Sequence, residues 1–173
     1  MLGLLIACWN DKYYYWFWRP ITLIREANTD GNPDTGADPT WLPLFDPATP
    51  VFSGPPLVTP AFPEHPSGHS SATSAFVHTL QSFFGTDKIA FSAFSNKSGT
   101  TRSFDRFSDP LKEVIDARVW AGIHFRTADV QGSVLGKRLP RTSRSNTSSR
   151  SDHAEPLGAA THVRTVSAAL PNI

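Results

Sequence analysis

Three short blocks of polar residues, in a fixed order, constrain the fold of this chain more than any other feature. They are Lys12 followed after six residues by Arg19-Pro20, then Pro66-Ser67-Gly68-His69, then Arg118 followed after five residues by His124. Together they supply three cations, a hydroxyl, a glycine amide and two imidazoles. A fold that gathers these groups would bind a tetrahedral oxyanion, with one histidine to bond the central atom and one to transfer protons.

The composition of the chain excludes several classes of protein. The chain has 173 residues and a net charge of +1, enough for one domain and too little charge to favour nucleic acid or a membrane surface. Cys8 is the single cysteine, so no intrachain disulfide can form. The apolar run from Leu2 to Trp9 is too short to cross a bilayer and lacks the basic region of a signal peptide. We expect no membrane span, and the compartment stays unknown.

Periodicity predicts a mainly α-helical chain. One helix is expected from about Leu4 to Ala27, either kinked or split at Pro20. A second is expected over residues 67–84, ending at Gly85, and a third from Ser108 to about Arg126. Asp129 opens a last short helix that runs toward Lys137.

Two other segments are less regular. Residues 28–66 are rich in proline, glycine and aspartate, which predicts a long irregular loop over the site, with one helical turn near Trp41. Residues 88–95 alternate loosely between apolar and polar, which predicts a short strand or an extended excursion.

This arrangement places the blocks on helices. Lys12 and Arg19, seven apart, would share one face of the first helix. The second block would present free N–H groups at a helix N-terminus, where anions are favoured. Arg118 and His124 would lie on the third helix, about a third of a turn apart. Each block also has a plainer interpretation: charged side chains that reach solvent, a serine N-cap beside a surface histidine, and a core histidine near a surface arginine.

In this order the three blocks resemble the vanadium-dependent haloperoxidase and type 2 phosphatidic acid phosphatase superfamily. The resemblance covers roughly residues 7–139. The haloperoxidase-like branch is the more similar one, as judged from two segments, Lys12-Tyr-Tyr-Tyr-Trp-Phe-Trp-Arg-Pro20 and Trp120-Ala-Gly-Ile-His-Phe-Arg126. The resemblance implies a helical bundle, vanadate as cofactor, and oxidation of halide by hydrogen peroxide.

The resemblance also implies roles for the block residues. The residues that would contact the oxyanion are Lys12, Arg19, Ser67, Gly68 and Arg118. His124 would be the axial vanadium ligand, His69 the acid–base, and Lys12 would activate bound peroxide. Residues that would line the pocket or support it are Phe62, seven before His69, together with His65 and Asp129.

The same pocket would hold phosphate, and two alternatives to the haloperoxidase remain open. In a soluble acid phosphatase without cofactor, His124 would attack phosphorus and His69 would protonate the leaving group. A third reading is an inactive remnant that binds phosphate, vanadate or a partner chain. Whether the chain is an enzyme is therefore undecided from the sequence.

Both ends of the chain differ from the pattern of that superfamily. Few residues precede Lys12, and arginine and serine dominate after Lys137, which favours a truncated or frame-shifted product. Helices expected in the family would then come from an oligomer or from elsewhere. We expect a partial helical domain over residues 1–137 and a disordered or non-native tail over 138–173.

Overall fold

A computed structural model describes residues 2–44, 59–96 and 98–147, with side chains described as far as Arg138. Its four longer helices are α1 (Leu2–Tyr15), α3 (Gly68–Phe84), α4 (Asp109–Trp120) and α5 (Arg126–Thr147). The shorter elements are α2 (Pro20–Arg25), a 3₁₀ turn η1 (Ala27–Thr29), and the strands β1 (Phe91–Ser95) and β2 (Thr100–Phe104). The expected mainly helical bundle is confirmed.

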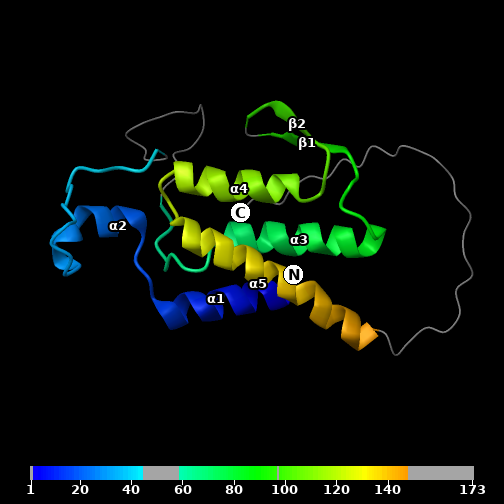
Figure 1. The fold of residues 1–173 in the computed structure, drawn as a ribbon, viewed down its shortest axis with the longest axis horizontal. Coiled ribbons are helices and arrows are strands. Elements are labelled where there is room, and N and C mark those ends of the chain that lie inside the picture. The colour runs from blue at the N-terminus through cyan, green and yellow to red at the C-terminus, as the bar shows by residue number, and fades with distance from the viewer. Residues whose placement is uncertain (1, 45–58, 97, 148–173) are drawn as a thin grey trace, which may run out of the picture.

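The α3–α5 pair forms the centre of the bundle. α1 and α4 each pack against both of these helices, and α2 lies apart at one end (Figure 1). Two glycines of α5 allow the close approach. A Cβ at Gly132 would lie 2.5 Å from the carbonyl oxygen of Ser67, and a Cβ at Gly136 would lie 2.2 Å from that of Ser71. Any larger side chain would force the two helices apart.

The first predicted helix is in fact two. α1 ends at Tyr15, Trp16 takes a left-handed conformation with φ 48°, and Arg19 is extended with φ −79° and ψ 158°. Pro20 then begins α2, where the proline ring fits because the first turn needs no donated hydrogen bond. The split is therefore confirmed, but the shared helical face of Lys12 and Arg19 is wrong.

The second helix forms as predicted. Ser67 is its N-cap, with a side-chain oxygen that accepts a hydrogen bond from the Ser70 N–H at 3.4 Å. Gly85 ends the helix with φ 70°, a left-handed conformation that glycine adopts without steric cost.

The third helix is shorter than predicted. α4 ends at Trp120, and Gly122, with φ 74°, turns the chain toward α5. His124 therefore lies in the loop between α4 and α5, not on the helix that carries Arg118. A side chain at Gly122 would also meet the Trp41 ring at 2.9 Å. Because Gly122 leaves the helical region of backbone space, the helix cannot continue to Arg126.

Three further expectations are corrected or extended. The strand over residues 88–95 shortens to β1 and pairs antiparallel with β2, a partner that was not predicted. No helical turn forms at Trp41; its N–H instead closes a turn onto the carbonyl of Asp38 at 3.1 Å. α5 begins at Arg126 and extends ten residues past Lys137, while residues 148–173 lie outside the described part.

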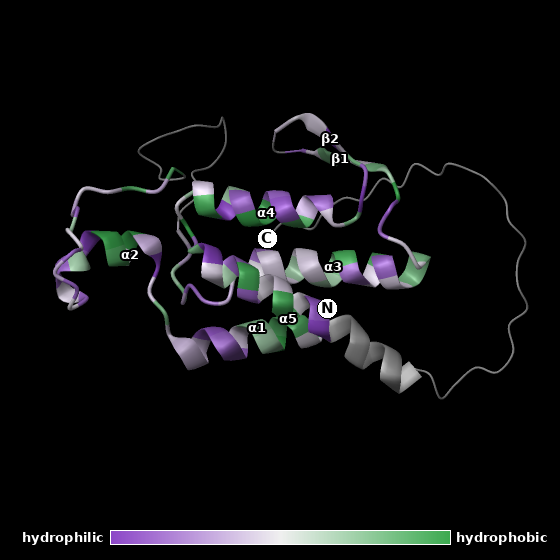
Figure 2. Ribbon diagram, in the orientation of Figure 1, coloured by the Kyte–Doolittle hydropathy of each residue, from purple (hydrophilic) through white to green (hydrophobic). Residues whose placement is uncertain are grey.

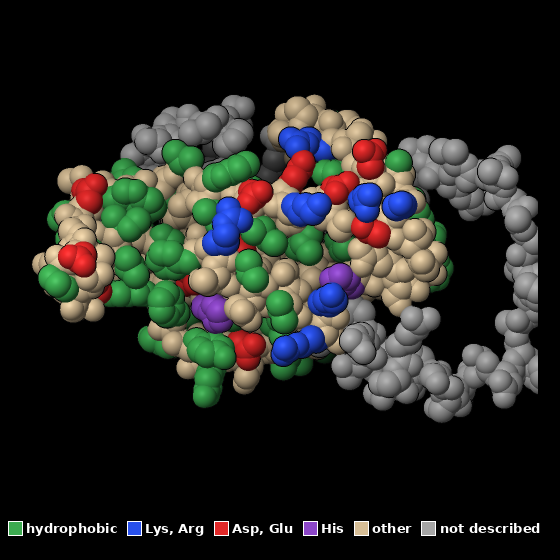
Figure 3. Space-filling model, in the orientation of Figure 1, with side chains coloured by type: hydrophobic (Ala, Val, Ile, Leu, Met, Phe, Trp, Pro, Cys, Tyr) green, Lys and Arg blue, Asp and Glu red, His purple; other side chains and the backbone are tan. Residues whose placement is uncertain are grey.

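The core is small and unusually polar. Buried apolar side chains include Leu4, Cys8, Val77 and Ile123, yet a lysine, an arginine, a histidine and two carboxylates are buried among them. In Figure 2, α4 carries hydrophilic and hydrophobic residues side by side, and none of its residues is buried. Charged side chains of both signs gather over α4 in Figure 3. Among the described residues, no helix is long and apolar enough to cross a membrane.

Candidate functional site

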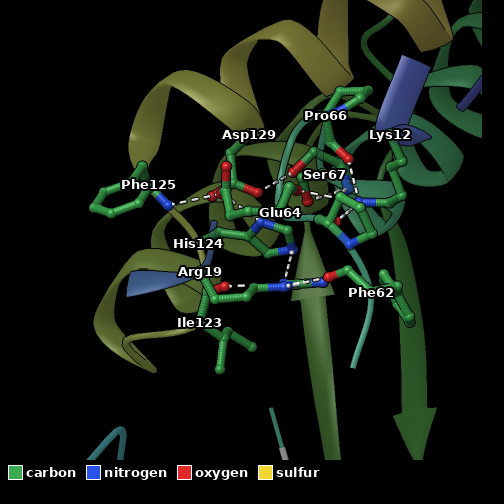
Figure 4. A network of polar contacts seen from close by, with 12 residues as sticks. Lys12, Arg19, Phe62, Glu64, Pro66, Ser67, Ile123, His124, Phe125 and Asp129 are labelled. Carbon is green, nitrogen blue, oxygen red and sulfur yellow. Dashed lines mark hydrogen bonds and ion pairs between the residues drawn. The ribbon is translucent and has the colours of Figure 1, made fainter. Parts of the chain in front are cut away.

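His124 lies at the centre of a buried polar cluster (Figure 4). Its Nδ1 is 2.7 Å from Oε1 of Glu64, and the same oxygen accepts the backbone N–H of Phe125 at 2.9 Å. Glu64 is 1% exposed. The sequence reasoning missed this residue, although it is the sole acid in the stretch from Pro60 to Ser82, next to the second block.

Arg19 approaches His124 from another side of the ring. Its Nη1 is 3.3 Å from Nε2 of His124 and donates to the carbonyl of Ile123 at 3.0 Å, while its Nε donates to the carbonyl of Phe62 at 3.0 Å. Nη2 of Arg19 is buried and has no partner among the described residues. The first and third blocks therefore meet at His124, with one guanidinium nitrogen, Nη2, still without a partner among the described residues.

Lys12 serves a different part of the cluster. Its ammonium donates to three backbone carbonyls, those of Pro63 at 3.0 Å, Glu64 at 3.1 Å and Pro66 at 2.6 Å. These three bonds use every proton that an ammonium carries. Burial lowers the pKa of Lys12 to about 8, which still leaves it mostly charged at neutral pH. Lys12 thus holds the loop that enters the second block.

The second block meets α5 through Ser67 and its neighbours. The Ser67 N–H donates to the carbonyl of Ala128 at 3.0 Å, and the Ser70 hydroxyl donates to Oδ1 of Asp129 at 2.8 Å. Oδ2 of Asp129 is buried without a described partner, and burial raises the pKa of this carboxyl. Asp129 therefore supports the start of α3, and the carboxylate that contacts His124 comes from Glu64 instead.

His69 and Arg118 are the least engaged members of the blocks. His69 is exposed, and its ring makes no hydrogen bond with the described residues. Partial burial, and then the positive charges of Arg118, Arg19 and Lys12, lower its pKa to about 4. Nε of Arg118 is buried and unpartnered within the same described part, and burial lowers the pKa of that guanidinium.

Two further sequence candidates line the cluster. The Phe62 ring lies between two cations, 5.2 Å from Nζ of Lys12 and 4.9 Å from the guanidinium carbon of Arg19. His65 packs edge-on against Tyr15, with ring centroids 5.0 Å apart. Phe62 therefore shapes the cluster, whereas His65 belongs to its rim.

Electrostatics keep His124 neutral. Burial, followed by the charges of Arg19, Arg118 and Lys12, lowers the pKa of His124 to about 2. Burial also raises the pKa of Glu64 to about 7, against the opposing effect of the Phe125 N–H. A neutral imidazole retains one lone pair, so it can bond to an electrophilic central atom.

The chemistry of this donor set suits a tetrahedral oxyanion. Unpartnered cationic N–H groups of Arg19 and Arg118 are available, and the first-turn N–H groups of Gly68 and His69 point out of α3. In the described part of the chain, no group of three or more histidine, cysteine or acidic side chains could ligate a metal cation. The polar groups without a described partner are therefore mainly N–H donors, which are complementary to an anion.

Comparison with known proteins gives consistent matches. A family model described as the VCPO second helical-bundle domain matches residues 1–151. The curated vanadium chloroperoxidase of Curvularia inaequalis is 38% identical over 79 residues, which cover 46% of this chain and 12% of that protein.

Solved structures extend the match. A bacterial vanadium-dependent iodoperoxidase matches with a TM-score of 0.64 and 29% identity, over 82% of this chain and 30% of that one. A holo-type bacterial vanadium-dependent chloroperoxidase matches with a TM-score of 0.59 and 21% identity, over 84% and 33%. The second match supports the fold alone. This chain spans about an eighth of the curated relative and about a third of each solved structure.

Proposed function

Because the chain belongs to the vanadium haloperoxidase family, we propose that its polar cluster binds vanadate and oxidises halide with hydrogen peroxide. The observation that carries the proposal is the buried His124, whose Nε2 faces only a 3.3 Å contact from Nη1 of Arg19, a contact that bound vanadate would replace, with Nη2 of Arg19 unpartnered beside it. Bound vanadate would supply a Lewis-acid centre for peroxide activation. The protein's own residues would bind the anion and transfer protons.

Each side chain has a defined task in this proposal. Arg19 and Arg118 neutralise the oxygens of the anion, and the N–H of Gly68 adds a donor at the start of α3. Nε2 of His124 bonds the central atom. Lys12 could reach an oxygen only by releasing one of its three carbonyls, so we assign it to holding the loop, and we assign Ser67 to the cap of α3 and the support of Asp129.

His69 would move protons. Its low pKa in the free protein reflects partial burial among three cations. A bound anion would offset those charges and raise the pKa toward neutrality, where an acid–base residue is most effective.

A phosphatase is the second candidate, because the same neutral Nε2 of His124, backed by the Glu64 carboxylate, is also suited to attack phosphorus. The substrate would then be a phosphate monoester, and His69 would protonate its leaving group. A third candidate is a domain that binds the anion without turnover.

Three assays on the purified full chain separate these functions. Vanadate-dependent halogenation of an activated diketone by peroxide supports the haloperoxidase. Release of p-nitrophenol from its phosphate, inhibited by vanadate, supports the phosphatase. Stabilisation against unfolding by vanadate or phosphate without either activity supports the binding domain.

His124→Ala is expected to abolish vanadate binding and whichever activity is present. The matched control is His78→Ala, on α3, whose Nδ1 pairs with Gln81 outside the cluster. Vanadate-dependent turnover that survives His124→Ala would contradict the proposal.

A further inference from the structure

We propose that Glu64 is a positioning residue, which fixes His124 as the tautomer protonated on Nδ1 and so keeps the lone pair of Nε2 available to bond the central atom of the oxyanion. This inference rests on the proposed function, since it takes Nε2 as the atom that bonds the ligand. No sequence block contains Glu64.

The first argument comes from the acceptor role of Oε1. The backbone N–H of Phe125 can only donate, so Oε1 at 2.9 Å must accept. Nδ1 of His124 lies 2.7 Å from that same oxygen. An ionised Glu64 can only accept, so the hydrogen bond there requires that Nδ1 carry the proton; the same holds for a carboxyl group protonated on Oε2.

The second argument comes from the opposite ring nitrogen. Nε2 lies 3.3 Å from Nη1 of Arg19, and a guanidinium has donors but no acceptor. Nε2 must therefore present its lone pair. This contact agrees with the same tautomer, but at 3.3 Å it is longer than the 2.7 Å contact between Nδ1 and Glu64, so Glu64 chiefly decides which ring nitrogen carries the proton.

The third argument is that Glu64 is held rigidly. Its N–H donates to the carbonyl of Phe17 at 2.9 Å, and its own carbonyl accepts from Lys12 at 3.1 Å. The side chain is almost fully buried, so it has little freedom to leave His124. Asp129, the other nearby carboxylate, is bonded to Ser70 and does not contact His124 in its place.

The test compares Glu64→Met with Glu64→Gln in the full chain. Methionine has a similar shape but offers no strong acceptor, so ¹⁵N NMR of His124 should show protonation spread to Nε2. Vanadate affinity measured by titration calorimetry should fall by roughly 10–100-fold, as for other residues that orient a metal ligand. Glutamine keeps a carbonyl oxygen and should preserve the Nδ1–H tautomer, with a smaller loss of affinity.

The control is Glu113→Gln, a half-exposed carboxylate on α4 that pairs with Arg102 and should alter neither readout. If Glu64→Met does not fold, Glu64→Asp replaces it, because it retracts the carboxylate by one methylene and should also mix the tautomers. Wild-type tautomer and affinity in the folded Met or Asp variant would overturn the proposal.

An error in the proposed function would give a different result from an error in the role of Glu64. Vanadate binding that survives His124→Ala would remove the ligand role of His124, while the ¹⁵N signature would still report whether Glu64 sets the tautomer.

Discussion

Replacing Lys12 with methionine tests how the loop before the second block is held. The substitution keeps an unbranched side chain of similar length but removes the three donors. The carbonyls of Pro63, Glu64 and Pro66 would then lose the ammonium. Cys8 is a weak substitute, because its Sγ lies 4.0 Å from the carbonyl of Pro66.

The expected cost follows from two opposing contributions. Hydrogen bonds to a charged group contribute about 2 kcal/mol each, so three of them contribute about 6 kcal/mol. Methionine avoids the burial of a charge, which the fall in the pKa of Lys12 from 10.5 to about 8 sets at about 3 kcal/mol. We therefore expect the free energy of unfolding to fall by about 3 kcal/mol.

Urea unfolding at pH 7, followed by far-UV circular dichroism, measures this change. The control is Lys112→Met, because that ammonium is exposed and its contact with Asp109 is 3.9 Å long, so the loss should stay below about 0.5 kcal/mol. If the two variants lost the same stability, Lys12 could not be holding the loop.

Three more outcomes follow from the structure. Gly136→Ala should lower the free energy of unfolding by about 2 kcal/mol, because the new Cβ would meet the backbone of α3. Gly3→Ala has open space around it and should raise the free energy of unfolding by about 1 kcal/mol. Denaturant midpoints measure both changes. Gly122→Ala should cost more than about 1 kcal/mol, because its φ of 74° is unfavourable for alanine and Trp41 is in the way; a thermal melt no lower than that of the wild type would contradict this. Acid titration of stability should distinguish Glu64→Gln from the wild type. The lowered pKa of His124 (about 2) removes stability as pH falls below 6.5, whereas the raised pKa of Glu64 (about 7) adds stability as pH falls from 7 to 4.5. Between pH 6.5 and 4.5 the variant should therefore lose about 1.4 kcal/mol per pH unit more than the wild type in urea titrations.

Local sequence signals were sufficient for parts of the fold. The serine cap and terminal glycine bounded α3 correctly, and Ser108-Asp109-Pro110 placed the start of α4 within one residue. Each of these signals acts within one helical turn, where the chain's own residues decide the outcome.

Other features depended on tertiary context. The left-handed Trp16 follows the end of α1 within an aromatic run, and beyond this turn Arg19 reaches the carbonyls of Phe62 and Ile123, which are distant in sequence. Gly122 is a local signal for the end of α4, but a glycine within a helical pattern does not by itself predict that the helix stops there.

Some residues of the candidate site could likewise be predicted from the sequence, and others depended on tertiary context. Spacing identified the cations and the imidazoles, because those residue types are chemically distinctive. It could not identify Glu64, whose role depends on a fold that brings residues 64 and 124 together. It also could not separate Asp129 from Glu64 as the carboxylate on His124, since only the packing of α3 against α5 decides that Asp129 meets Ser70.

Two side chains hold the loop of residues 62–66 by hydrogen bonds to its backbone carbonyls. Arg19 donates to Phe62, and Lys12 donates to Pro63, Glu64 and Pro66. Its location is therefore set by noncovalent anchors that come from elsewhere in the chain. A substitution at position 12 would consequently be transmitted to His124 through Glu64, although the Lys12 ammonium bonds only backbone carbonyls. The first helix thus controls the imidazole from a distance, by way of the loop that it holds.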